Sequence, residues 1–90
     1  MRIPVYTRQF ERDLKRMKKR CKNIEKLKIV LRSLVEEEGL DSIYRDHKLI
    51  GKWLGRRECH IESNWLLIYK MEDDRIIFER TGSHSDLFRK

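Results

Sequence analysis

The chain has 90 residues, of which 39% are hydrophobic and 41% charged, and 22 Lys and Arg outnumber 15 Asp and Glu to give a formal charge of +7. Residues 1–90 are therefore expected to form one domain with a thin core, because so small a chain buries only roughly 60–65% of the surface that it exposes when unfolded. The composition excludes a disordered chain, and no run approaches the ~20 apolar residues that cross a bilayer, so we expect a cytoplasmic protein without a membrane partner. Its positive charge favours a polyanionic partner such as RNA, DNA or an acidic protein.

The first half of the chain predicts a short strand and two helices. Residues 2–6 are typical of an edge strand, because Pro4 cannot donate a ladder hydrogen bond. Thr7 and Asn23 are candidate N-caps for two amphipathic helices, the second of which ends near Gly39. The turn between them is short, so the helices should form an antiparallel hairpin. The expected apolar faces consist of Phe10, Leu14, Met17 and Cys21 in the first helix and Ile24, Leu27, Leu31, Leu34 and Val35 in the second.

The second half of the chain predicts a meander of strands. Residues 40–55 read as a loop with a short extended piece around 49–53, followed by strands at about 56–61, 65–71 and 75–81 and a short helix over 83–88. The order β-α-α-β-β-β-α predicts an α+β fold, with a small, mostly antiparallel sheet and the helical hairpin on one face. The middle strand, WLLIYKM, is apolar on both faces, which is typical of a central strand covered on one side and flooring a hollow on the other. The alternation of this strand leaves open which of its two faces is covered and which one floors the hollow.

Alternation separates the side chains of the strand at 56–61. It places His60 with Glu58 and Glu62 on one side, and Cys59 with Arg57 and Ile61 on the other. Cys21 and Cys59 form no CxxC pair, so we expect two reduced, partly buried thiols.

Four side chains could support chemistry on RNA: His47, His60, His84 and Arg80 all lie near strand ends or adjoining loops. Histidine exchanges protons near neutrality, and arginine binds phosphate with a forked set of donors. Cleavage of RNA by its own 2′-hydroxyl needs a base, an acid and a cation on the developing charge. Three aromatic side chains could stack an unpaired base: Trp53, Trp65 and Tyr69.

Simpler interpretations compete with this one. A histidine near a turn is usually a surface group, a tryptophan in a strand usually belongs to the core, and the basic stretch over residues 12–28 could be a solvated helix face. A zinc site is disfavoured, because Cys59 and His60 are adjacent and point to opposite faces of a strand. A Ser or Cys hydrolase is equally disfavoured, because no GxSxG motif occurs.

Residues 46–88, DHKLIGKWLGRRECHIESNWLLIYKMEDDRIIFERTGSHSDLF, resemble the YafQ branch of the RelE/ParE toxin superfamily. The similarity rests on the DH pair, the glycine and tryptophan of GKW, the RECHI strand, the WLLIY strand and the terminal RTGSH followed by LF, in matching order and spacing. The first half of the chain is similar in layout only. The resemblance implies a RelE-like fold and a ribosome-dependent mRNA interferase that is silenced by a cognate antitoxin.

The resemblance also implies roles for particular residues. His47, His60 and His84 would be the active-site histidines, and Arg80 would bind the scissile phosphate. Partners would be the antitoxin, in a possible hetero-oligomer, together with the ribosome and mRNA; no cofactor or metal is expected. The residues expected to contact or shape the substrate site are Asn64, Trp65, Phe88, Arg57 and Lys52.

The chain departs from the family pattern beside the tryptophan. Asn64 stands where the family usually has aspartate, Ser63 stands where it usually has proline, and Lys48 likewise replaces a proline after His47. An amide cannot take up a proton, so the base should be His47 or His60, with His84 as the acid. Two alternatives follow: a catalytically weak or inactive module that binds RNA or the ribosome, and a ParE-like toxin of gyrase.

Overall fold

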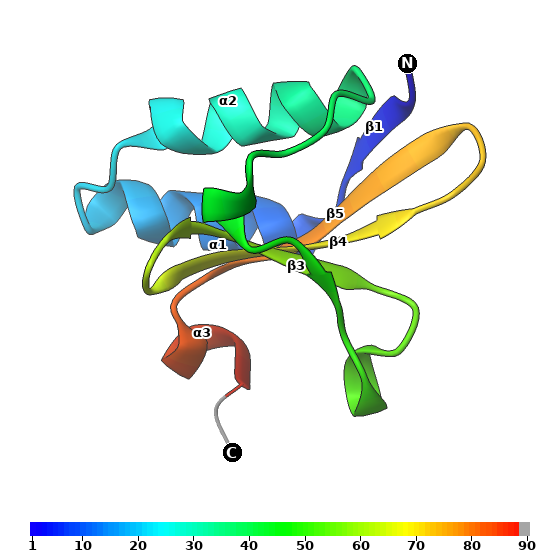
Figure 1. The fold of residues 1–90 in the computed structure, drawn as a ribbon. Helices are drawn as coiled ribbons and strands as arrows, with labels where there is room; N and C mark the ends of the chain where they lie inside the picture. The colour runs from blue at the N-terminus through cyan, green and yellow to red at the C-terminus, as the bar shows by residue number, and fades with distance from the viewer. Residues whose placement is uncertain (89–90) are drawn as a thin grey trace.

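The computed structural model describes residues 1–88 as a five-stranded sheet with helices on both faces (Figure 1). The strand order is β1-β5-β4-β3-β2, and only the β1–β5 pair is parallel. This confirms the predicted α+β fold. In chain order the elements are β1 (Ile3–Tyr6), α1 (Arg8–Lys19), α2 (Ile24–Val35), a 3-10 helix (Ser42–Tyr44), β2 (His47–Lys48), a second 3-10 helix (Gly51–Trp53), β3 (Arg57–Glu62), β4 (Trp65–Met71), β5 (Arg75–Gly82) and α3 (His84–Phe88).

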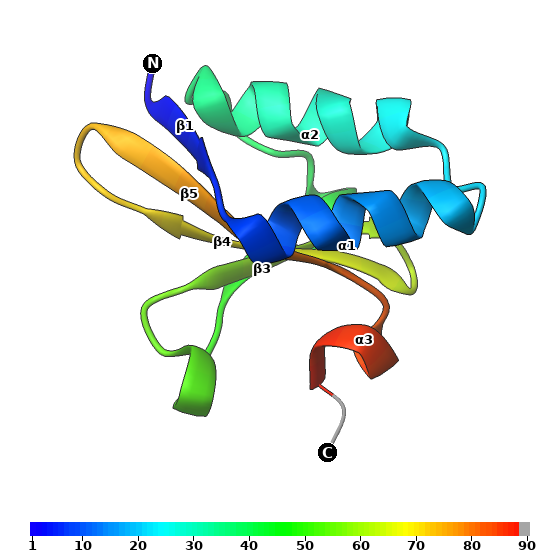
Figure 2. The ribbon, with the colours of Figure 1, turned by 180° about the vertical axis from the view of Figure 1, so that it is seen from behind.

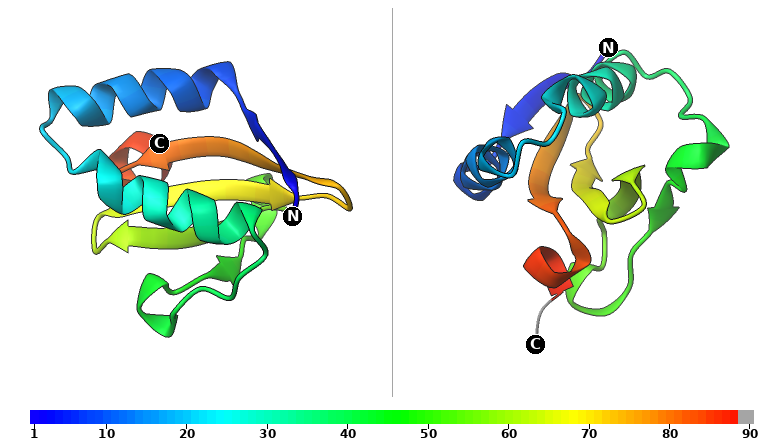
Figure 3. Two further views of the ribbon diagram at one scale, coloured as in Figure 1. Left: turned by 90° about the horizontal axis from the view of Figure 1, so that it is seen from above. Right: turned by 90° about the vertical axis from the view of Figure 1, so that its left-hand side faces the viewer.

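The hairpin of α1 and α2 forms as its capping residues predict. The Thr7 hydroxyl accepts a hydrogen bond from the Phe10 amide at 3.0 Å, and the Asn23 side chain accepts one from the Glu25 amide at 3.1 Å. Viewed from behind and from above, the two helices run antiparallel across one face of the sheet, with α1 beside β5 (Figures 2 and 3). The opposite face carries only short elements, α3 and the Gly51–Trp53 helix.

The core lies on both faces of β4. Trp65, Leu67 and Tyr69 point toward the hairpin and are fully buried, while Leu66 and Ile68 point the other way, toward Leu87 of α3. The hairpin side is therefore the main core, and the other side is a thin apolar layer completed by Leu49 and Trp53. The buried residues of the main core are Phe10, Met17, Leu27, Val30, Leu34, Cys59, Ile61, Trp65, Leu67, Tyr69, Ile76 and Phe78.

Three local expectations are wrong. The extended piece is not at 49–53 but at His47–Lys48, which pairs with β3, whereas residues 51–53 turn as a 3-10 helix that begins at a left-handed Gly51 (φ 66°). Cys21 is exposed, because it takes the left-handed conformation (φ 60°) that ends α1. Glu62 leaves the side that it was expected to share with His60, because the β3–β4 pairing shifts register between these residues.

Within residues 1–88, every helix is too short or too polar to cross a lipid bilayer.

Candidate active site

Strand register brings the predicted catalytic residues to the face opposite the hairpin, called here the histidine face. His47 pairs with Glu58, Glu58 with Ile68, and Ile68 with Arg80, which makes one row across four strands. Residues that pair directly across strands share a face of the sheet. His60 pairs with Leu66 in the neighbouring row, so it lies on the same side.

The three imidazoles form a continuous series on this face. The ring centroids of His47 and His60 are 6.3 Å apart, and those of His60 and His84 are 6.1 Å apart. Phe88 extends the series, with its ring 5.9 Å from that of His84. Residues distant in the sequence thus meet because β2 pairs with the start of β3, whereas His84 at the start of α3 lies beside His60 and is held by Asn64, just after β3.

Glu58 is a central residue of the site that the sequence analysis did not select. Its Oε2 atom lies 3.2 Å from His47 Nε2 and 3.6 Å from His60 Nε2, and the residue is only 5% exposed. Its other oxygen, Oε1, is buried and has no hydrogen-bond partner among residues 1–88. A buried carboxylate oxygen without a hydrogen-bond partner lowers the free energy of unfolding, and such unpaired groups occur at functional sites. Alternation had already placed Glu58 beside His60, which is the signal that could have identified it.

Two contacts hold the His47 ring in place. The ring Nδ1 lies 2.7 Å from the backbone oxygen of Arg45, and a carbonyl can only accept, so Nδ1 carries a proton. The other ring nitrogen faces Glu58, which is also an acceptor when ionised. His47 is thus held at both ring nitrogens, by the Arg45 carbonyl at Nδ1 and beside the Glu58 carboxylate at Nε2.

Asn64 holds His84. Its side-chain oxygen accepts the His84 backbone N–H at 3.0 Å and lies 3.3 Å from the ring Nδ1. An amide oxygen can accept from Nδ1–H as a carboxylate does, although it adds no negative charge. This contact orients the ring and leaves Nε2 for proton exchange.

Ion pairs fasten α3, which carries His84, to α1. Asp86 accepts from Arg20 at 2.6 and 3.0 Å and lies 3.3 Å from Arg16. It also caps its own short helix, because its carboxylate accepts the Ser83 amide at 2.9 Å. The Arg20 guanidinium and the Ser83 donors hold the pKa of Asp86 well below its usual range. A helix of five residues has little stability of its own, so these contacts position it.

Arg80 is held by a buried carboxylate that the sequence analysis also missed. Its Nε and Nη2 donate to Asp13 at 2.7 and 3.1 Å, and Asp13 is fully buried in α1. Asp13 also accepts from the Thr81 amide at 3.2 Å and from Arg16 at 2.7 Å. Its position three residues after Phe10, on the apolar face of the helix, was the available signal.

Two aromatic residues that were expected to stack a base are core residues instead. Trp65 and Tyr69 are both fully buried, and Trp65 donates its indole N–H to Thr81 at 2.9 Å. Neither ring is accessible from the surface, so Trp65 could shape the site only from within the core. Trp53 is partly buried against the apolar layer under the histidine face.

The predicted cations Arg57 and Lys52 differ in position. Arg57 pairs across the strands with Tyr69 and donates to Asp46 at 3.1 Å, so it lies on the hairpin side of the sheet, away from the histidines. Its expected role in substrate binding stays a prediction, and its position gives no contact with the histidine face. Lys52 is exposed on the 3-10 helix that flanks the histidine face.

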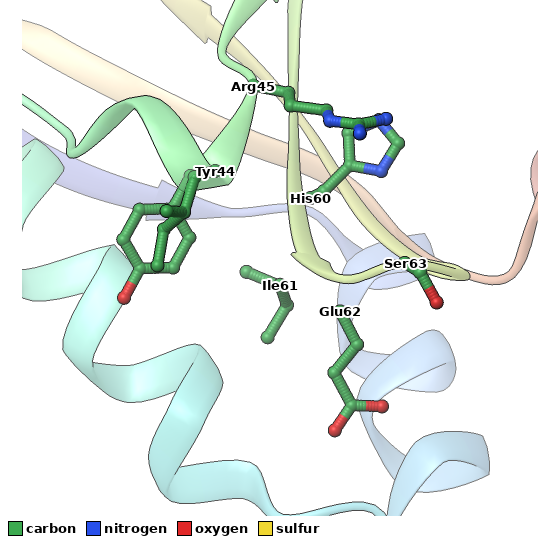
Figure 4. Close-up of a pocket in the computed structure, with 7 residues that line it drawn as sticks. Tyr44, Arg45, His60, Ile61, Glu62 and Ser63 are labelled. Carbon is green, nitrogen blue, oxygen red and sulfur yellow. The ribbon is translucent and has the colours of Figure 1, made fainter.

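A pocket of about 230 Å³ opens beside His60 (Figure 4). Its walls come from the Ser42–Tyr44 helix and from the end of β3 with the turn that follows. The pocket is lined by Ile43, Tyr44, Arg45, His60, Ile61, Glu62 and Ser63.

Within residues 1–88, His, Cys, Asp and Glu side chains form no group of three or more that could hold a metal ion.

Comparisons with known proteins agree with this geometry. Residues 2–89 match the family model described as bacterial toxin of type II toxin-antitoxin system, YafQ. The mRNA interferase toxin YafQ of Escherichia coli strain K12 is 43% identical over 84 residues, which are 92% of this chain and 91% of that protein. A chain in the crystal structure of the E. coli DinJ–YafQ complex is 42% identical, with a TM-score of 0.92 over 98% of this chain and 99% of that one. A metal-bound toxin from Helicobacter pylori is 33% identical, with a TM-score of 0.91 over 98% and 100% of the two chains. These likenesses include the helical hairpin, which the sequence had matched in layout only.

Proposed function

The chain belongs to the YafQ family of bacterial toxins of type II toxin–antitoxin systems, and from that premise we propose that it is an mRNA interferase. It would cut messenger RNA on the ribosome and so stop translation in the cytoplasm. The observation that carries the proposal is the series of three imidazoles, two of which lie beside the buried Glu58 carboxylate.

The proposed reaction is attack of a 2′-hydroxyl on the adjacent phosphorus. The 2′-oxygen forms a bond to phosphorus while the bond to the 5′-oxygen breaks, which leaves a 2′,3′-cyclic phosphate and a 5′-hydroxyl. A base removes the proton of the 2′-hydroxyl, and an acid gives one to the leaving 5′-oxygen. No water or redox partner is consumed in this step.

The contacts favour His60 as the base and His84 as the acid. Both ring nitrogens of His47 already have a neighbour, because Nδ1 lies 2.7 Å from the carbonyl oxygen of Arg45 and Nε2 lies 3.2 Å from Glu58 Oε2. As a cation, His47 would stabilise the charge that develops on the phosphate. The Glu58 carboxylate, 3.6 Å from His60, would stabilise that ring once it has gained a proton. Asn64 would aim His84 at the leaving oxygen.

Arg80 is proposed to bind the scissile phosphate. Its backbone lies in the same row as His47 and Glu58, while its guanidinium turns to the buried Asp13 of α1, which restricts its orientation. Its side chain is 21% exposed, and the guanidinium has five N–H donors, of which Asp13 uses two.

Dependence on the ribosome follows from the openness of the site. Half of the His47 side chain is exposed, and His84 is also exposed, so the toxin alone does little to orient RNA for in-line attack. A ribosome that holds the message in the reactive geometry could contribute as much as roughly 7–11 kcal/mol. The basic outer surface of the hairpin would contact ribosomal RNA.

We propose that the reaction needs no metal, because the chain's own side chains supply acid, base and cation. The metal-bound toxin from H. pylori makes this worth testing directly. Cleavage should persist when a chelator is added, provided that free Mg²⁺ is kept at the concentration that the ribosomes need. A separate control titration establishes that concentration.

A cognate antitoxin is the proposed protein partner, in a hetero-oligomer. The E. coli relative was crystallised with DinJ. For this chain, a formal charge of +7 favours an acidic or amphipathic antitoxin.

The test is primer extension on messages from cells that express the protein or its His84→Ala variant. The wild type should produce new 5′ ends within translated codons and arrest growth, and the variant should do neither. Growth arrest of equal strength from both proteins, without cuts, would instead support an inactive RNA-binding module, which is the alternative that Asn64 favours. Arrest with damaged DNA would indicate a gyrase toxin.

A further inference from the structure

We propose that the pocket beside His60 binds one nucleotide of the RNA next to the scissile linkage, with Arg45 on its phosphate and Ile43 against its base. The inference rests on the proposed function, because it assigns a second part of the same substrate. His60 lines both this pocket and the imidazole series, so an RNA strand in the site would pass from one to the other.

Arg45 supplies the phosphate donor. It is exposed at the end of the Ser42–Tyr44 helix, and its side chain reaches toward His60 across the mouth of the pocket (Figure 4). Among residues 1–88, its guanidinium has no hydrogen-bond or ion-pair partner, in contrast to Arg57 and Arg80. Its backbone is left-handed (φ 51°), and its carbonyl receives His47 Nδ1–H, so the position of this residue is tied to the reaction centre.

The charge around the pocket suits a phosphate. Its one carboxylate, Glu62, accepts hydrogen bonds from Lys26 at 2.9 Å and Lys22 at 3.0 Å. These lysines hold the pKa of Glu62 below its usual value and compensate its charge. Three cations thus surround one anion, and the rim is net positive. A polyanion such as RNA is therefore attracted to the rim of the pocket.

The walls of the pocket suit a base. Ile43 is 73% exposed at the rim, while Ile61 and Tyr44 form the inner apolar surface. Ser63 adds one hydroxyl that can donate or accept. At about 230 Å³ the pocket is smaller than the roughly 300–1,000 Å³ that encloses a drug-sized ligand, which limits it to one nucleotide.

The experiment measures kcat and KM for cleavage of a translated message by the wild type, Arg45→Gln, Arg45→Lys and Arg75→Gln. Gln keeps the Cβ and the backbone carbonyl that holds His47, so only the guanidinium is lost. Arg75, an exposed arginine at the β4–β5 turn, is the matched control for charge. Arg45→Gln should raise KM about 10- to 100-fold with kcat within a few-fold, Arg45→Lys should recover part of that loss, and Arg75→Gln should match the wild type.

Ile43→Ser tests the base contact. It should alter which nucleotides flank the cut sites in primer extension, while thermal melting stays unchanged because Ile43 is exposed.

The possible results separate this proposal from the proposed function. If the wild type cuts and Arg45→Gln has the same KM and cut sites, the pocket binds no nucleotide although the toxin is a nuclease. A fall in kcat alone would mean that Arg45 acts only through His47. Weakened antitoxin binding with normal cutting would assign the pocket to the antitoxin, and a wild type that makes no cuts would overturn both proposals.

Discussion

The two faces of the sheet use the same strands for different purposes. On the hairpin face, Trp65, Leu67 and Tyr69 are fully buried in an apolar core. On the histidine face, the neighbouring residues of β3 carry imidazole and carboxylate groups over a thin apolar layer. The hairpin face therefore maintains the fold. The histidine face can expose polar groups, and the contacts among these groups do not determine stability. Substitutions on the two faces should consequently have different effects.

The largest expected effect is the loss of activity in His84→Ala. Removing a general acid lowers the cleavage rate by about 10²–10⁴-fold. The ring is exposed and Leu87 still anchors α3, so the melting temperature should change little. Cleavage assays and thermal melting of the same preparation check both statements, and a large fall in melting temperature would show that His84 is mainly structural.

Trp65→Ala is the matched change on the hairpin face. It removes a fully buried ring and its hydrogen bond to Thr81, so it should lower the free energy of unfolding by about 3–5 kcal/mol. Urea denaturation measures this loss. Any fraction of the variant that stays folded should cut RNA; a stable but inactive Trp65→Ala protein would mean that the two faces are not independent.

Glu58→Gln should reduce cleavage by about 10- to 100-fold, which is the range for losing a hydrogen bond to a charged group. The substitution is isosteric, so the fold should remain. A comparison of the pH–rate profiles of the wild type and the variant separates a role in the mechanism from simple packing, because a change in packing alone would leave the shape of the profile unchanged. An unshifted profile with full activity would remove Glu58 from the mechanism.

Asp86→Asn should cost about 1 kcal/mol of stability at neutral pH by weakening the link between α3 and α1. The pKa of Asp86 is lowered in the folded protein, so its contribution is fully present above the unfolded value of about 3.9 and is lost as pH falls below it. Wild type and variant should thus differ in stability at pH 7 and converge in strong acid. Equal stability at both values would show that the ion pairs with Arg16 and Arg20 hold nothing in place.

The smallest effect concerns the cysteines. Burial raises the pKa of the Cys59 thiol to about 12, whereas Cys21 is exposed. A thiol reagent should therefore label one cysteine in the native protein and two after denaturation, without loss of activity. Cys21→Ser should abolish native labelling, and labelling that persists would show that Cys59 becomes accessible.

The sequence predicted the hairpin face better than the histidine face. Thr7 and Asn23 are local signals, and both were confirmed as N-caps. The apolar spacing of the two helices was confirmed except at Cys21, which is exposed, and it missed the buried Val30. The site instead depends on register. Alternation placed Glu58 beside His60, but only the pairing of β2 with β3 reveals that His47 lies across from Glu58.

Errors arose where tertiary contacts override local pattern. The sequence analysis placed the extended piece after His47 rather than at it, because two residues carry too little pattern to mark a strand. The resemblance made Trp65 a residue that shapes the site, and its ring lies in the core; Arg57, which was selected as a substrate contact, turns to Asp46 on the far side of β3. Family motifs thus indicated the right region, and burial decided which of their residues can touch RNA.

The chemistry at the cut ends tests the central claim most directly. A message cut by the wild-type toxin on ribosomes should leave downstream fragments with a 5′-hydroxyl and upstream fragments with a 2′,3′-cyclic phosphate, so that downstream fragments ligate only after treatment with a kinase. Downstream fragments that carry a 5′-phosphate, or the absence of any fragment, would contradict cleavage by acid–base catalysis on the histidine face.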